Sequence, residues 1–286
     1  MSFERTANGL SNNYLFHSVD FVIYVEGKYE ETNSDLVSYD HYFWKSVAEI
    51  VSPETKFKVL SRGGKQALLP IANEIISGNI SNILVALDRD YDFECENALS
   101  HPRVIYTQGY SWENDVWSSE ALMHLVGELN IGDGIQPERA DELKVCISDF
   151  YRKAIRVARL NIAAMQNGME NIFAASKMRG LVELNGCQLP RFNREFFSAT
   201  VHESTAASPI RMLSKVELTE SHIQGHLMAH FGYHFVCRVL SILGQKASIC
   251  ADMLSTIAVN LLKSILLDCH SSKHIYYKSQ FNNAVA

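Results

Sequence analysis

The stretch FVIYVEG, residues 21–27, decides how the chain folds. A second stretch, ILVALDRD, residues 83–90, repeats its pattern of five hydrophobic residues followed by an acid. Neither run alternates with polar residues, which is typical of strands that are buried on both faces of a parallel sheet. Ligands of open parallel sheets bind at the carboxyl ends of the strands, so we expect Glu26, Asp88 and Asp90 to lie together at that edge.

These three acids are candidate ligands of a divalent metal. Asp88 and Asp90 are two residues apart at a strand end, where both can reach one hard cation. Crowded carboxylates repel one another unless a metal neutralises them, which favours Mg²⁺ or Mn²⁺. Such an ion orients a water molecule and stabilises charge on phosphoryl oxygens. Two alternatives stay open: the acids are solvated or cap the next helix, and Glu26 acts as a general base.

The flanking segments alternate between strand and helix patterns, which predicts an α/β fold with right-handed crossovers. Beyond a linker at residues 132–137, strand patterns nearly vanish. We therefore expect an α/β domain at residues 1–130 and a mostly helical domain at residues 131–286. The predicted strands are Phe21–Val25, residues 57–60, Ile83–Leu87 and Val104–Tyr106, and the predicted helices are residues 35–51, 66–77, 113–129, 140–175, 218–243 and 247–267.

Three further motifs accompany these strands: SRGGK at residues 61–65, the double acid Glu26-x-x-x-Glu30, and YSWEN at residues 110–114. Over about residues 20–125 the set resembles the TOPRIM domain of topoisomerases, bacterial primases and OLD-family nucleases. The double acid and the YSWEN loop are most similar to the OLD-type branch. The resemblance implies a metal-dependent phosphodiesterase with Glu26, Asp88 and Asp90 as metal ligands and catalytic residues, supported by Glu30 and Glu113. Asp92 is a weaker candidate for the same role.

The whole chain resembles the AriB family, the TOPRIM effectors of the PARIS anti-phage defence system. This resemblance implies an endoribonuclease toxin that an ABC-type, AriA-like ATPase holds silent until infection releases it. The free effector is then expected to cleave host tRNA as a homodimer. Two alternatives remain: an OLD-like DNA nuclease, and a non-enzymatic module whose acids hold a structural ion and whose helical half docks a partner.

Basic residues supply candidate nucleic-acid contacts in an otherwise acidic chain of net charge −6. Lys65 follows two glycines at a helix start, where N–H groups and the helix dipole favour an anion, and Lys28 has similar standing. Residues 152–194 contain eight basic and two acidic residues. A local basic stretch of this kind is able to hold phosphate, although a solvated helix face is the simpler interpretation. The candidates in it are Arg152, Lys153, Arg156, Arg159, Lys177, Arg179, Arg191 and Arg194.

The histidines, the cysteines and two tyrosines have predicted structural roles. His222, His226, His230 and His234 fall every four residues, which predicts a packed or interface stripe on one helix rather than zinc ligands. The six cysteines show no Cys-x-x-Cys pair, which indicates reduced core thiols. Tyr276 and Tyr277 are expected to be packing residues. The chain shows neither an export signal nor an apolar run long enough to span a bilayer, so we expect a cytoplasmic protein.

Overall fold

A computed structural model of the chain describes residues 9, 12–27, 38–132, 134–186, 188–205, 217–245 and 249–286. The chain forms two compact units, and both are discontinuous in sequence. The first consists of Met1–Arg89, Leu99–Gln108 and Leu262–Ala286, and the second of Asp90–Ala98 and Gly109–Leu261.

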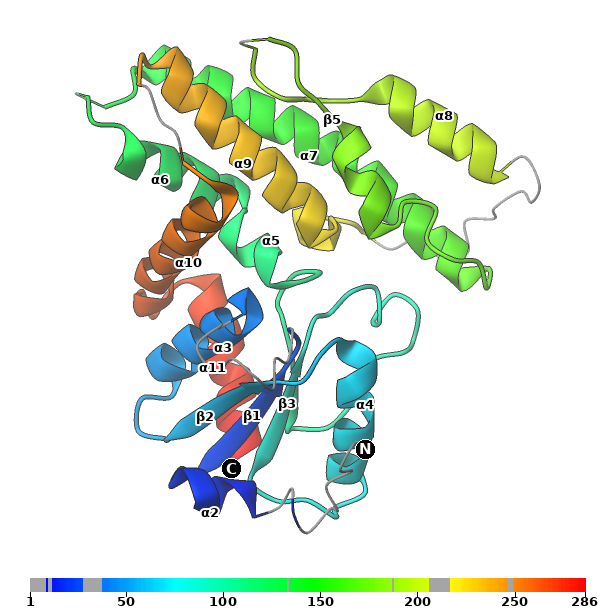
Figure 1. Ribbon diagram of the computed structural model, residues 1–286, viewed down its shortest axis with the longest axis vertical. Helices are drawn as coiled ribbons and strands as arrows, with labels where there is room; N and C mark the ends of the chain where they lie inside the picture. Colours follow the sequence, from blue (N-terminus) through cyan, green and yellow to red (C-terminus); the bar gives the residue numbers. More distant parts are fainter. Residues whose placement is uncertain are drawn as a thin grey trace. The chain divides into compact units, whose positions relative to one another are not determined.

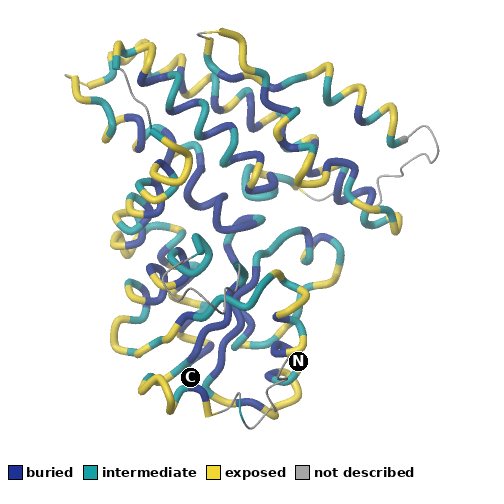
Figure 2. Tube along the Cα trace, viewed as in Figure 1, coloured by how far each residue is buried: buried dark blue, intermediate teal, exposed yellow. Residues whose placement is uncertain are grey.

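A four-stranded parallel sheet is the centre of the first unit (Figure 1). Its strands are β1 (Phe21–Val25), β2 (Phe57–Ser61), β3 (Ile83–Leu87) and β4 (Val104–Tyr106), in the order β2-β1-β3-β4. β1 and β3 are adjacent, with Val22 opposite Ile83 and Val25 opposite Ala86. All five residues of β3 are buried, as the absence of polar alternation predicted (Figure 2). The expected parallel α/β sheet is therefore confirmed.

Helices cover both faces of this sheet. On one face, α4 (Lys65–Ile76) packs Leu68 and Ile75 against alternate strand residues such as Tyr24 and Val85. On the other face lie α3 (Tyr39–Val51) and α11 (Ser272–Val285), shown in Figure 1. The short α2 (Asn13–His17) precedes β1.

The C-terminal helix α11 joins this unit through aromatic contacts and hydrogen bonds. Tyr277 is fully buried, with its ring 5.8 Å from that of Trp44 in α3. The ring of Phe281 lies 5.4 Å from that of Phe57 in β2. The Tyr276 hydroxyl donates to the carbonyl oxygen of Thr107 at 3.2 Å. The prediction that Tyr276 and Tyr277 are packing residues is confirmed.

The second unit is mostly helical. Its longest helix, α7, is amphipathic and buries apolar residues such as Leu143, Phe150 and Val157 along one face. The Phe150 ring stacks on Phe231 of α9, with the centroids 3.9 Å apart. The elements are α5 (Trp112–Val116), α6 (Ser119–Leu129), α7 (Pro137–Gln166), η1 (Ala175–Leu181), β5 (Val182–Glu183), β6 (Arg191–Phe192), α8 (Arg194–Thr205), η2 (Glu220–His222), α9 (Gly225–Ile242) and the first part of α10 (Ala251–Leu267).

The two units differ from the expected division at residue 130. Gly109 to Leu129 belong to the second unit, because α5 and α6 pack on α9. Residues 262–286 belong to the first unit, because α11 packs on α3 and β4. A helical segment at the end of the chain thus completes the unit that contains the sheet.

Several helix boundaries also differ from the expectation. The helix predicted at 113–129 is two helices, because Ser118 accepts a hydrogen bond from Ala121 N and caps a new start at α6. The helix predicted at 140–175 ends at Gln166, shortly before Gly168 with φ +71°. α3 begins after Ser38, whose side chain caps the helix by accepting a hydrogen bond from His41 N. The sequence did not predict α8, α11 or the hairpin of β5 and β6.

The described cysteines are all free, but they are not all in the core. Cys95, Cys146 and Cys237 are half-buried, whereas Cys250 and Cys269 are exposed. The expectation of core thiols is therefore wrong for the last two.

No single described helix combines the length and apolar composition that a membrane crossing needs. The pair α10 and α11 meets the requirement only when the two helices are counted together across an 80° bend.

Candidate active site

Two of the predicted motifs meet at the carboxyl edge of the sheet in the first unit. Gly27 N donates to Gly63 O at 3.0 Å, and Gly63 N donates to Gly27 O at 2.7 Å. Gly27 has φ +122°, and a Cβ atom there would lie 2.3 Å from Ser38 Oγ. Only glycine fits such a backbone at so close an approach. This pair of glycines fixes the loop after β1 against the loop that leads into α4.

The side chain of Glu26 lies between the start of α4 and the end of β3. Its Oε2 accepts a hydrogen bond from Lys65 N at 3.0 Å, and its Oε1 accepts one from Asp88 N at 3.1 Å. Lys65 is the first residue of α4, where backbone N–H groups have no partner within the helix and the dipole favours an anion. The carboxylate is therefore held in a fixed orientation by two backbone donors.

Lys65 also links α4 to the end of β3 through its side chain. Its Nζ donates to the carbonyl oxygen of Asp88 at 2.8 Å. The next residue, Arg89, donates its N–H to Thr107 Oγ1 at 3.0 Å, which anchors the end of β3 to the segment after β4. Glu26, Lys65 and Asp88 are all half-buried. The predicted neighbourhood of Glu26 and Asp88 at one sheet edge is confirmed by these contacts.

The donor set of this edge fits a hard divalent cation. Mg²⁺ is commonly held by one or two carboxylates, and water and substrate phosphates complete its octahedral shell. Glu26 and Asp88 are the two acids that follow β1 and β3 at this edge, and carboxylates of this kind are the ligands that Mg²⁺ prefers. In the described parts of the chain, no group of three His, Cys, Asp or Glu side chains forms a site for a metal ion. A magnesium ion at this edge would thus depend on water and phosphate for its other ligands.

The remaining predicted acids have different locations. Glu30 and Lys28 lie outside the described residues. Asp90 belongs to the second unit, has φ +49°, and donates its N–H to Tyr110 O at 2.7 Å. Asp92 follows it in the same unit and is half-buried. That Asp90, Asp92 and Glu113 support a metal stays a prediction.

The YSWEN segment docks the start of α9 in the second unit. The Asn114 side chain accepts from Ser111 N at 3.0 Å and donates to the carbonyl oxygen of Ile223 at 2.8 Å. A Cβ atom on Gly225 would lie 2.0 Å from Ser111 Oγ, so α9 approaches α5 as closely as glycine permits. This docking role of Asn114 was not predicted, and a Ser-x-x-Asn capping pattern was its signal in the sequence.

Glu113 is buried at the same place. Ser111 Oγ donates to its Oε2 at 2.5 Å, and His226 Nδ1 lies 3.9 Å from its Oε1. Its carboxylate lies beside Gly225, the first residue of α9, where the helix dipole favours a negative charge. These contacts give Glu113 a structural role within the second unit.

The four histidines do not form one stripe on one helix, because His222 belongs to η2 and only the other three to α9. His222 Nε2 lies 3.3 Å from Glu94 Oε1, and both side chains are nearly buried. The rings of His230 and His234 are 4.6 Å apart. Burial, with smaller effects of His234 and Arg179, lowers the pKa of His230 to about 4. His230 is therefore neutral at neutral pH.

The predicted basic contacts of residues 152–194 lie on four elements of the second unit, namely α7, η1, β6 and α8. Arg152, Arg156 and Arg159 are exposed on α7, and Arg152 forms an ion pair with Asp149 at 2.6 Å. Lys177 and Arg179 lie in η1, where Arg179 is exposed. Their accessibility is compatible with a nucleic-acid contact, which stays a prediction.

No protein-family model matches this chain, and a comparison with curated proteins gives no significant match.

Proposed function

We propose that this protein hydrolyses phosphodiester bonds of nucleic acid with the help of a divalent metal ion, Mg²⁺ or Mn²⁺. One observation carries the proposal: Glu26 at the end of β1 and Asp88 at the end of the adjacent β3 are joined through the 3.1 Å hydrogen bond from Asp88 N to Glu26 Oε1. The two acids thus share the sheet edge at which open parallel sheets bind their ligands.

Each residue of this edge has a distinct role in the proposal. Glu26 and Asp88 hold the ion, which supplies charge stabilisation for the phosphoryl oxygens and lowers the pKa of a bound water. Glu26 is kept in place by Lys65 N and Asp88 N, so little reorganisation is needed before reaction. Lys65 brings a positive charge to the same edge, and its role in the proposal is to attract a substrate phosphate. Asp90 as a third ligand, and Glu30 and Glu113 as supports, are proposed on the resemblance alone.

The substrate and the biological setting rest on resemblance to the AriB family. We propose that the substrate is tRNA and that the protein is a toxin of an abortive-infection system. An ABC-type ATPase similar to AriA keeps it inactive, and the released form acts as a homodimer in the cytoplasm. An OLD-like DNA nuclease is the alternative within the same chemistry.

A non-enzymatic module is the second candidate, and one observation favours it. Both oxygens of Glu26 accept hydrogen bonds from backbone N–H groups, which is also what a purely structural carboxylate does. In that case Glu26 ties β1, β3 and α4 together without any chemistry. The two interpretations differ in the effect of Glu26→Gln, which retains an acceptor oxygen but removes the charge.

Small-RNA sequencing of cells that express the free protein tests this proposal. Wild type is expected to cut one or a few tRNAs at discrete positions, whereas Glu26→Gln leaves all tRNAs intact at the same protein level. Intact tRNA with broken DNA would assign the OLD-like activity. If both nucleic acids stay intact and the cells grow normally, the nuclease proposal is wrong.

A further inference from the structure

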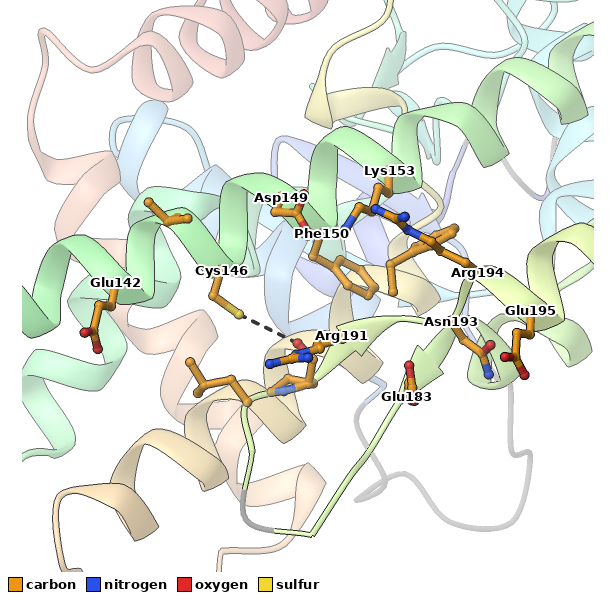
Figure 3. A pocket seen from close by; sticks show the side chains of 14 residues that line it. Glu142, Cys146, Asp149, Phe150, Lys153, Glu183, Arg191, Asn193, Arg194 and Glu195 are labelled. Carbon is orange, nitrogen blue, oxygen red and sulfur yellow. Dashed lines mark hydrogen bonds and ion pairs between the residues drawn. The ribbon is translucent and has the colours of Figure 1, made fainter.

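A pocket of about 630 Å³ opens in the second unit, and the proposed reaction does not use it. It lies between α7 and the segment that runs through β5 and β6 into α8 (Figure 3). Pockets of this size accommodate small ligands or single groups of a larger one. Six of its lining residues bear on the nature of a ligand: Cys146, Phe150, Lys153, Arg191, Phe192 and Arg194.

Two arginines enter the pocket from the strand side. Arg191 belongs to β6 and Arg194 is the first residue of α8, and both are exposed. Within the described residues, neither guanidinium forms an ion pair with a carboxylate. Guanidinium groups present five donors in a planar fork that matches the oxygens of phosphate and carboxylate. The strand side of the pocket therefore offers two positive charges to a ligand.

Lys153 adds a third positive charge from α7. Its Nζ forms an ion pair with Asp149, and the same carboxylate is also bound by Arg152 at 2.6 Å. The hydrogen bond from Lys153, followed by that from Arg152, lowers the pKa of Asp149. Two cations thus share one carboxylate, so the Asp149 charge is more than balanced.

The pKa of the Cys146 thiol is affected by the charges of Asp149, Lys153 and Arg191. Burial raises the pKa of Cys146 to about 11, and Asp149 adds to the increase, while Arg191 and Lys153 act in the opposite direction. Side chains from both walls of the pocket therefore place their charges near one thiol. Figure 3 shows Cys146 on α7 and Arg191 on the opposite strand.

Three other acids, Glu142, Glu183 and Glu195, line the pocket. Glu142 forms an ion pair with Arg139 at 2.6 Å and lies eleven positions before Lys153, about 16 Å along the axis of α7. Glu183 accepts a hydrogen bond from Asn185 at 2.7 Å and is the cross-strand neighbour of Arg191. Glu195 follows Arg194 on α8 and is exposed. Lys153, Arg191 and Arg194 are the three basic residues that line the pocket.

Two aromatic residues, Phe150 and Phe192, line the pocket. The rings of Phe150 and Phe192 lie 5.8 Å apart, and both residues are buried. Phe150 is fixed from behind by its stack on Phe231. Aromatic and cationic side chains in one pocket match the base and the phosphate of a nucleotide.

We propose that this pocket binds a phosphate group of a single-stranded nucleic acid through Lys153, Arg191 and Arg194, with the adjoining nucleotide against Phe192. The proposal rests on the proposed function for the nature of the ligand. It adds a binding site on the second unit that is separate from the acids at the sheet edge. RNA and DNA share the phosphate chemistry, and the test separates them.

Fluorescence anisotropy of short labelled single strands, RNA and DNA of one sequence, measures this binding in EDTA, where metal-dependent cleavage is stopped. The double variant Arg191→Ala with Arg194→Ala is expected to bind at least tenfold more weakly. Its slope of log affinity against log salt is expected to fall by about 0.7 for each phosphate that the variant no longer binds. Arg191→Lys with Arg194→Lys keeps the charges and should retain most of the salt slope.

Lys144→Ala is the control, because Lys144 is exposed on α7, the helix that forms the other wall, pairs with Asp141 and does not line the pocket. It should leave affinity and slope unchanged. Weakening on both strands assigns the phosphate backbone, and weakening on RNA alone assigns an RNA site. Unchanged affinity in the alanine double variant, with thermal unfolding like wild type, overturns the proposal. Because binding is measured without cleavage, a failure of the nuclease proposal appears separately, as absent hydrolysis in Mg²⁺.

Discussion

The backbone N–H of Asp88 donates a hydrogen bond to the carboxylate of Glu26 at 3.1 Å, across 62 positions of sequence. This contact exists because β1 and β3 are adjacent and parallel, so that the residues following them emerge at the same edge. Lys65 N supplies the second donor to Glu26 at 3.0 Å. Glu26, Lys65 and Asp88 thus form one hydrogen-bonded group, which substitutions can test.

The substitution Glu26→Gln should lower the cleavage rate much more than the free energy of unfolding. Glu26→Gln keeps one acceptor oxygen but faces its amide N–H₂ toward a backbone N–H, so it should lower the free energy of unfolding by about 1 kcal/mol. Nucleic-acid cleavage should fall by about 100-fold or more, equivalent to about 2.7 kcal/mol of transition-state stabilisation. Urea unfolding and cleavage rates of the same samples check both numbers. Equal cleavage by wild type and variant would remove Glu26 from the active site.

Lys65→Met tests the role of the positive charge beside Asp88. The methionine keeps most of the stem but loses the donor to Asp88 O. We expect about a tenfold loss of cleavage and a change of unfolding free energy of about 1 kcal/mol or less. Lys58→Met is the control, because Lys58 is exposed on β2. The idea fails if the two variants cleave at the same rate.

Gly27→Ala should be far more damaging than another substitution at a positive φ angle. Gly78 has φ +73°, and a Cβ atom there would have open space within 4 Å, so Gly78→Ala meets backbone strain of about 1–2 kcal/mol alone. Gly27→Ala adds a clash with Ser38 Oγ at 2.3 Å and separates the glycine pair. Urea denaturation should show a loss about 2 kcal/mol larger for Gly27→Ala. Similar losses for both would contradict the close approach.

Asn114→Ala tests the docking of α9 in the second unit. It leaves Ser111 N and the carbonyl oxygen of Ile223 without their partner in a buried place, which costs about 2–4 kcal/mol in total. Asn185→Ala removes an exposed hydrogen bond and should change stability by about 0.5 kcal/mol or less. Thermal unfolding followed by circular dichroism compares the two. A wild-type melting temperature for Asn114→Ala would rule out the role assigned to this side chain.

We expect the half-buried His230 to lower the free energy of unfolding in mild acid. Its pKa is lowered from the ordinary 6.5 to about 4 by burial, assisted by His234 and Arg179. Below pH 6.5 the unfolded chain binds a proton that the folded protein does not, so stability falls between about pH 6.5 and 4. His230→Gln cannot gain this proton, and its unfolding free energy should change less over that range. Identical pH profiles of wild type and variant would contradict the burial of His230, and His202→Gln on α8 serves as the control.

The strands could be predicted because each is a short hydrophobic run with a clear end. The proximity of Glu26 and Asp88 could be predicted from the sequence, because residues that follow adjacent parallel strands lie at the same edge of the sheet. The two-residue strands β5 and β6 are too short to leave a period. The position of α11 depends on Tyr277 and Phe281 finding Trp44 and Phe57, contacts that no local pattern encodes.

The partners of Glu113 could not be predicted from its local sequence. The resemblance to OLD-type nucleases implied that Glu113 supports a metal ion, and that stays a prediction. The structure gives it Ser111 and the start of α9 as partners, and the glycine at position 225 that permits this contact is more than a hundred positions away. The break between α5 and α6 was not predicted, because Ser118 lies within an otherwise helical pattern.

Cleavage by the purified protein, with and without metal, decides whether Glu26 and Asp88 form an active site. Labelled tRNA and single-stranded DNA are incubated with wild type, Glu26→Gln, Asp88→Asn and the exposed control Glu49→Gln, in Mg²⁺ and in EDTA. We predict that wild type and Glu49→Gln cut tRNA only with Mg²⁺ and that the other two variants do not. Cleavage that survives EDTA or either active-site substitution would contradict the account, as would intact nucleic acid in every reaction.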